Sequence, residues 1–142
     1  MISLSPAQAS DTQQLLALTQ AYVGDIEYSS TYEGLLEYLQ NSNDIVYVAE
    51  DKGVIIGYCC GRISHHMSFN KPIADILELY LAEDYRGSGL GRQLLAAMDA
   101  EFTSRGVNRT RVFVRESSEN ARKFYEACGY EGYPMVMYRK DI

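Results

Sequence analysis

The chain has 142 residues, 46% of them hydrophobic and 23% charged, which is the length and composition of one globular domain over residues 1–142. The formal net charge of −6 argues against a nucleic-acid partner, because neutralising phosphates requires a basic surface. No apolar run approaches the roughly 20 residues that span a bilayer, and the N-terminus has neither a basic start nor an apolar signal core. We therefore expect a cytoplasmic protein that binds neither nucleic acid nor membrane.

The first half of the chain reads as a strand, two helices and a pair of strands. Ser10 and Asp11 offer a cap to the first helix, and Gly24 ends it. A turn at Asp51-Lys52-Gly53 between two apolar, β-branched runs indicates a hairpin. The expected ranges are residues 2–4, 12–23, 32–40, 44–50 and 54–63.

The second half alternates strands with helices. Gly106 closes one helix, Gly129 closes the next, and Pro134 interrupts the last strand near its start. The expected elements are a strand over 73–81, a helix over 93–105, a strand over 109–115, a helix from 119 to 129 and a strand over 133–140. The order predicts an α/β fold with a mixed, largely antiparallel twisted sheet of six to seven strands and four helices on its faces.

The cysteines and histidines give no metal site. Cys59, Cys60 and Cys128 are an odd count without metal spacing, and the adjacent pair points to opposite faces of a strand. We expect reduced thiols that fill apolar space. His65 and His66 are neighbours in a loop, and such neighbours rarely both bind one metal, so no metal is expected.

The 73–81 strand is joined to the following helix by a glycine-rich stretch, Tyr85-Arg86-Gly87-Ser88-Gly89-Leu90-Gly91-Arg92. Glycines at alternate positions let the backbone turn and leave it open to close approach. The unpaired N–H groups at a helix start suit a phosphate, and Arg86 and Arg92 add positive charge on either side. Neither the Walker A pattern nor the dinucleotide Gly-x-Gly-x-x-Gly pattern fits this spacing, and an ordinary strand-to-helix turn is the alternative interpretation.

This stretch resembles the pyrophosphate loop of the GNAT superfamily of N-acetyltransferases: Arg or Gln, two residues, Gly, one residue, then Gly or Ala. Arg86, Gly89 and Gly91 occupy the three positions. Downstream, residues 120–130 resemble the family's Asn-x-x-Ala-x-x-Phe-Tyr-x-x-x-Gly-Phe segment, shortened at its start and with Tyr130 in place of the usual Phe. The two motifs span residues 73–139, and the order of elements is also similar to the GNAT order over the first half.

The resemblance implies a GNAT-like acyl-CoA N-acyltransferase fold, acetyl-CoA as co-substrate and a possible homodimer. It implies that Tyr125 protonates the departing thiolate, and that strand backbone near Leu79 to Leu81 holds the pantetheine arm. In isolation, Tyr125 would read as a packed aromatic beside Phe124. The implied cofactor-binding residues are Leu79, Tyr80, Leu81, Arg86, Gly87, Ser88, Gly89, Leu90, Gly91, Arg92, Asn120 and Lys123.

Two carboxylates on the 73–81 strand are candidates for the base that takes a proton from the acceptor amine. Regular alternation puts Asp75 and Glu78 on opposite faces unless a bulge intervenes. The family places an acid at either position. We favour Glu78 as the catalytic base and assign Asp75 to the substrate site, while a solvated or ion-paired strand residue is the alternative for each.

An acidic and aromatic linker over residues 25–33 is a candidate surface for the acceptor, through ion pairing and cation–π contact. Tyr28 and Tyr32 are its candidate substrate residues, although an ordinary solvated loop is an equally simple interpretation. We expect an acetyl-CoA-dependent N-acetyltransferase acting by direct transfer in a ternary complex on a small cationic amine. The alternatives are a protein or peptide amine as acceptor, or a non-catalytic acyl-CoA-binding sensor.

Overall fold

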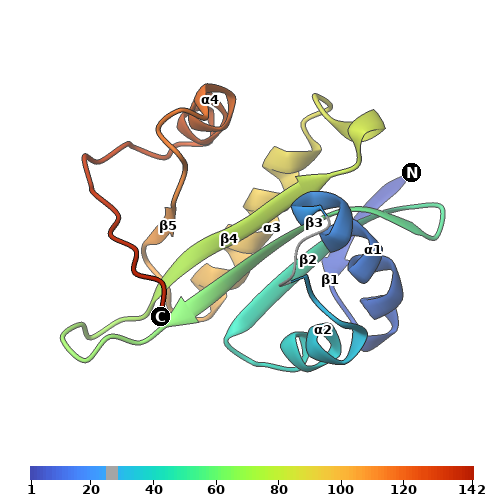
Figure 1. Ribbon diagram of the computed structural model, residues 1–142, viewed down its shortest axis with the longest axis horizontal. Helices are drawn as coiled ribbons and strands as arrows, with labels where there is room; N and C mark the ends of the chain where they lie inside the picture. Colours follow the sequence, from blue (N-terminus) through green and yellow to red (C-terminus); the bar gives the residue numbers. More distant parts are fainter. Residues whose placement is uncertain (25–28) are drawn as a thin grey trace.

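Within residues 1–24 and 29–142, the part of the chain that this computed structural model describes, five strands form one mixed sheet in the order β1-β2-β3-β4-β5 (Figure 1). Neighbouring strands run antiparallel except β4 and β5, which are parallel. The strands are β1 (Ile2–Pro6), β2 (Asp44–Asp51), β3 (Val54–Ser64), β4 (Ile73–Leu81) and β5 (Thr110–Val112).

Helices cover both faces of this sheet, as the sequence predicts. The described residues form α1 (Thr12–Val23), α2 (Tyr32–Leu39), α3 (Leu90–Ser104) and α4 (Glu119–Ala127). The first two lie on one face and α3 lies on the other, with α4 beyond it toward β5 (Figure 1). Thr31 caps α2 by accepting a hydrogen bond from the Gly34 N–H at 3.1 Å, and Gly24 ends α1 with a φ of 75°. None of the described helices is both long enough and apolar enough to cross a membrane.

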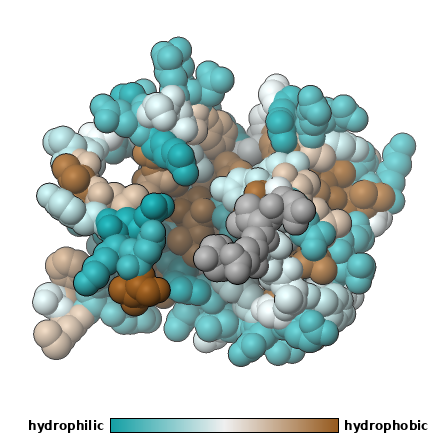
Figure 2. Space-filling view, in the orientation of Figure 1, coloured by the Kyte–Doolittle hydropathy of each residue, from teal (hydrophilic) through white to brown (hydrophobic). Residues whose placement is uncertain are grey.

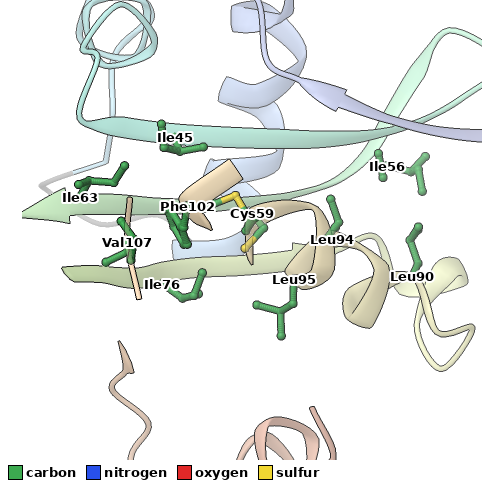
Figure 3. Packing of buried hydrophobic residues seen from close by; sticks show 13 residues of the cluster. Ile45, Ile56, Cys59, Ile63, Ile76, Leu90, Leu94, Leu95, Phe102 and Val107 are labelled. Carbon is green, nitrogen blue, oxygen red and sulfur yellow. The ribbon is translucent and has the colours of Figure 1, made fainter. Parts of the chain in front are cut away.

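The main core lies between the sheet and α3. Leu94, Met98 and Phe102 are at most 1% exposed and pack against Cys59 and Ile76 of the sheet (Figure 3). The other face has a second cluster under α1 and α2, formed by Leu15, Leu35, Val48, Ile55, Tyr58 and Cys60. Cys59 and Cys60 therefore point to opposite faces, as predicted.

The expected six to seven strands are wrong, because the described residues form five. The strand predicted over 109–115 shrinks to Thr110–Val112, since β5 pairs with β4 only at Ala74 to Ile76. The strand predicted over 133–140 is also absent. Those residues have no backbone hydrogen-bond partner in the described chain, and Pro134 removes one of the donors that a ladder would need.

One extra residue in β4 changes which side chains share a face. Cys60 pairs with Glu78 and Gly61 pairs with Ile76, so Leu77 is bulged and has no partner on β3. A Cβ at Gly61 would approach the Asp75 carbonyl oxygen and the Phe102 ring to 2.8 Å, so glycine is required where the strands draw together. The bulge places Asp75 and Glu78 on the same face as Arg62 and Cys60, the face covered by α1 and α2.

Candidate active site

The candidate site lies along β4, where this strand leaves β5. The parallel pairing stops at Ile76, so the edge of β4 from Leu77 to Leu81 has no strand beside it on that side within the described residues. Figure 2 shows a hollow with an apolar floor here, between the side of the molecule with α4 and the side with α1 and α2. The exposed edge includes the backbone of Leu79, Tyr80 and Leu81, the predicted contact for the pantetheine arm.

The glycine-rich loop lies at the end of this edge and leads directly into α3. Gly87 and Gly89 have φ angles of 75° and 86°, which L side chains rarely adopt, and the space where each Cβ would stand is open. Among the described residues, no side chain caps the helix at Gly89. The N–H groups of Leu90, Gly91 and Arg92, in the first turn, are therefore available to an anion.

The side chains around the loop hold its shape. The Ser88 hydroxyl donates to the Tyr85 carbonyl at 2.6 Å, and the Tyr85 hydroxyl donates to Asp51 at 2.9 Å. The Arg86 Nε donates to the Leu81 carbonyl at 2.9 Å, and its guanidinium lies 5.4 Å from the centroid of the Tyr80 ring. Arg86 thus ties the loop to the end of β4, a role that the sequence pattern did not suggest.

Helix α4 borders the same loop. Its Phe124 ring lies 3.4 Å from where a Cβ would be at Gly91, so glycine there gives close approach of α3 and α4. Asn120 and Lys123 are exposed near the start of α4, and the Lys123 ammonium pairs with Glu119 at 3.3 Å. Such a surface pair contributes little to stability, so it leaves Lys123 free to exchange partners.

Tyr125 lies on the α3 side of the sheet, at the border of the main core. Its ring packs against the Phe124 and Tyr130 rings, with centroid distances of 5.1 and 5.5 Å. Burial raises the pKa of Tyr125 well above its usual range, and Cys59 adds to the effect. The phenol therefore stays protonated at neutral pH, and within the described chain its hydroxyl has no hydrogen-bond partner.

Glu78 lies on the opposite face, in a group of tyrosines. Its carboxylate accepts a hydrogen bond of 2.8 Å from the buried Tyr58 hydroxyl. The Tyr80 ring lies next to the Tyr58 and Tyr22 rings, with centroid distances of 6.3 and 5.8 Å. Burial raises the pKa of Tyr22, and the charge of Glu78 raises it further.

Asp75 is on the same face but is already engaged. Arg111 donates to both carboxylate oxygens of Asp75, at 2.7 and 3.1 Å, and this pair joins β4 to β5. Both oxygens of this carboxylate are thus occupied by a charge-assisted hydrogen bond, which leaves Asp75 less available to an acceptor amine than Glu78. The bulge therefore brings both predicted carboxylates to one face, and the ion pair distinguishes them.

The remaining predicted substrate residues are not brought to this group. Tyr32 is the first residue of α2 and is 41% exposed, and no described contact joins it to Glu78. Tyr28 lies outside the described residues. Sequence reasoning missed Tyr22 and Tyr58, because their ranges predicted only an apolar helix face and a buried strand. The signal available was the number of tyrosines, 12 in the chain.

A sequence model of the Acetyltransferase (GNAT) family matches residues 12–130. The chain belongs to the GNAT family. It is 27% identical over 134 residues to an uncharacterized N-acetyltransferase of Chlorobaculum tepidum, covering 94% of this chain and 81% of that protein. It is 26% identical over 129 residues to the aminoalkylphosphonate N-acetyltransferase of Salmonella typhimurium, covering 90% and 84%. This GNAT protein is therefore an acetyltransferase, as predicted.

Solved structures of GNAT enzymes share the fold. An aminoglycoside acetyltransferase from an uncultured soil metagenomic sample has a TM-score of 0.86 and 22% identity, covering 99% of this chain and 97% of that one. An aminoglycoside N-acetyltransferase in complex with CoA has a TM-score of 0.83 and 17% identity, covering 99% and 95%. The second of these neighbours was solved with CoA bound.

Proposed function

We propose that this GNAT acetyltransferase moves an acetyl group from acetyl-CoA to a primary amine by direct transfer in a ternary complex, and that the acceptor is a small cationic amine. The observation that carries the proposal is the arrangement around β4. Glu78 and Tyr125 lie on opposite sides of the strand, beside the stretch where β5 no longer pairs with it. A base and an acid on opposite sides suit a reaction in which a proton leaves one reactant and another reaches the leaving group.

The loop residues fit the diphosphate of the co-substrate. Open space at Gly87 and Gly89 lets a bulky anion approach the backbone, and the unpaired N–H groups at the start of α3 favour negative charge. Arg92, Asn120 and Lys123 are exposed close to this helix start or on the neighbouring α4, where they would add contacts. The free edge of β4 at Leu79 to Leu81 would pair with the amide groups of the pantetheine arm.

Glu78 and Tyr125 each have a role in proton transfer during the reaction. An alkylammonium is about 0.1% neutral at pH 7, so deprotonation costs roughly 4–5 kcal/mol unless a base assists. Glu78 takes this proton, directly or through a water. The amine nitrogen bonds to the acetyl carbon, the carbon–sulfur bond breaks, and Tyr125 gives its phenolic proton to the sulfur. The nitrogen then loses its second proton to solvent, Tyr125 is reprotonated from solvent, and Glu78 releases the first proton to solvent, so one proton is released per amide formed.

The net charge of the chain and the aromatic rings beside Glu78 support a cationic acceptor. The net charge of −6 attracts cations, and Tyr22 and Tyr80 lie beside Glu78 with their rings in contact. Tyr32, exposed on α2, and Asp75 are proposed further contacts for the acceptor. The names of the similar proteins include aminoglycoside and aminoalkylphosphonate acetyltransferases, which also act on small amines.

The proposed function is tested by release of free thiol from acetyl-CoA across a panel of amines. We expect turnover with polyamines, aminoglycosides or aminoalkylphosphonates, and acetylated product by mass spectrometry. Peptides with a free N-terminus are the comparison, and faster turnover on them would replace the small amine with a protein acceptor. Thiol release that is the same with and without every amine would contradict the proposal.

A homodimer that uses the C-terminal segment is a further proposal. Residues 131–142 are exposed throughout, and Met135, Val136, Met137 and Tyr138 are 76–92% exposed. An apolar segment of this kind is unfavourable in water unless it is covered. Light scattering should give twice the 16.0 kDa chain mass, and a monomer at micromolar concentration would contradict this proposal.

A further inference from the structure

We propose that Tyr58 is a positioning residue for the Glu78 carboxylate: its hydroxyl holds one carboxylate oxygen, so that the other faces the acceptor amine. The inference rests on the proposed function, in which Glu78 is the base. It concerns a residue on β3 that carries no motif and that the sequence predicts only as part of a buried strand.

Tyr58 is fixed by its surroundings. It is 2% exposed, packs with Leu15 and Val48 in the cluster under α1 and α2, and pairs with Tyr80 across the β3–β4 ladder. A ring packed on this many sides has one position for its hydroxyl. The hydrogen bond of 2.8 Å to Glu78 Oε1 is therefore built into the core rather than formed by two mobile side chains.

The bulge in β4 makes this contact possible. Glu78 pairs with Cys60, two residues beyond Tyr58 on the same face of β3, only because Leu77 is skipped in the register. With regular alternation from Asp75, the Glu78 side chain would point to the α3 side, away from Tyr58. The bulge and the tyrosine thus act on the same carboxylate.

Tyr58 remains a donor over the working pH range. Burial raises its pKa far above the usual value, and the charge of Glu78 raises it further. The Cys60 thiol is also neutral there, since burial raises its pKa to about 12. Glu78 is the carboxylate that the Tyr58 hydroxyl contacts. The titratable or charged groups that face it from neighbouring elements are Tyr22 on α1, Tyr58 and Cys60 on β3, Tyr80 on β4, Arg86 over the Tyr80 ring, and the Asp75–Arg111 pair on the same face.

The two carboxylate oxygens of Glu78 therefore have different roles. Oε1 accepts from Tyr58, and among the described residues Oε2 has no such donor. Oε2 is thus the oxygen that takes the amine proton, while Tyr58 keeps its own.

The test uses Tyr58→Phe, which keeps the ring and removes the hydroxyl. We expect kcat/KM for the amine to fall about tenfold, the factor expected for one hydrogen bond to a charged group. The KM for acetyl-CoA should not change. The matched control is Tyr47→Phe, which removes a hydroxyl on β2 whose only described partner is Glu101 at 3.5 Å on the other face.

Two further measurements separate this inference from the proposed function. In the Glu78→Gln background, Tyr58→Phe should cause no additional loss, because Tyr58 acts through Glu78; additive losses would overturn the inference. A crystal structure of Tyr58→Phe should show the Glu78 carboxylate in a different position, and an unchanged carboxylate would also overturn the inference. If the carboxylate moves in Tyr58→Phe but Glu78→Gln leaves turnover intact, positioning stands and the proposed base is wrong.

Discussion

The two faces of the sheet carry different kinds of side chain. On the α3 side, Leu94, Met98 and Phe102 interlock with aliphatic strand residues and exclude water (Figure 3). On the α1–α2 side, the buried cluster includes Tyr58 and Cys60 and reaches a carboxylate, Glu78. The first face stabilises the fold through apolar packing. On the second face the buried polar groups are hydrogen-bonded, and this offsets the free-energy cost of burying them.

Strand β4 contributes both to the apolar core and to the proposed catalytic site. β4 contributes Ala74 and Ile76 to the apolar core, and the bulge at Leu77 then turns Glu78 toward the tyrosines. A single inserted residue thus separates the stabilising part of the strand from the part proposed for chemistry. Variants on the two faces should therefore fail in different ways, one in stability and the other in turnover.

The largest expected effect is on the packed face. Phe102 is 1% exposed, and Phe102→Ala should lower the free energy of unfolding by about 3–5 kcal/mol, because it removes buried surface and leaves a cavity. Urea denaturation measures this change. The control is Met67→Ala, in the exposed loop between β3 and β4, where we expect a change within about 0.5 kcal/mol. Equal losses for the two variants would show that the α3 face is not the stabilising one.

The next effect is on the other face. Glu78→Gln should lower turnover at least about 100-fold, the range for loss of a general base, with unchanged acetyl-CoA affinity and melting temperature. Thiol release and calorimetry measure the two quantities. Glu101→Gln is the matched control, because Glu101 is a half-buried carboxylate on α3 that pairs with Arg105. Normal turnover in Glu78→Gln would remove this carboxylate from the mechanism.

Tyr125→Phe should have a smaller effect, about tenfold or more on turnover with nearly intact co-substrate binding. Because burial raises the pKa of Tyr125, its neutral form is favoured, and turnover should not fall through loss of this proton as the pH rises to about 10. The pH profile of kcat measures whether turnover is maintained as the pH rises. Tyr130→Phe, on the neighbouring ring, serves as the control, and an equal loss in that variant would make the effect one of packing.

The smallest effect concerns the loop between the two faces. Gly89 has a φ of 86°, so Gly89→Ala should cost about 1–2 kcal/mol of backbone strain and weaken acetyl-CoA binding about tenfold. Gly53→Ala imposes the same strain in the β2–β3 hairpin, where φ is 83°. It should lower stability similarly without weakening binding. Calorimetry on both variants decides, and equal affinities would exclude the loop from the binding site.

The sequence predicted the parts of this molecule that local patterns determine. Helix α1 and strand β4 have the expected bounds, and the glycine-rich loop lies between β4 and α3, because caps, apolar spacing and glycines act over a few residues. The family motifs likewise pointed to an acetyltransferase, and the family match supports that conclusion.

The features that the sequence did not predict depend on contacts between segments that are far apart in the chain. The bulge at Leu77 arises from how β3 and β4 are paired, and the alternation of apolar residues does not reveal it. The contact between Tyr58 and Glu78 joins two strands, and the ion pair of Asp75 joins β4 to β5. The absence of the C-terminal strand has the same origin, since an apolar run becomes a strand only when it pairs with another strand.

The most direct test of the account is a crystal structure of the protein with acetyl-CoA or CoA bound. We expect the diphosphate on the N–H groups between Gly87 and Arg92, the pantetheine arm along Leu79 to Leu81, and the sulfur within about 3.5 Å of the Tyr125 hydroxyl. Glu78 should face the acetyl group from the other side of β4. A sulfur atom far from Tyr125, or an acetyl group closed off from Glu78, would contradict the proposed mechanism.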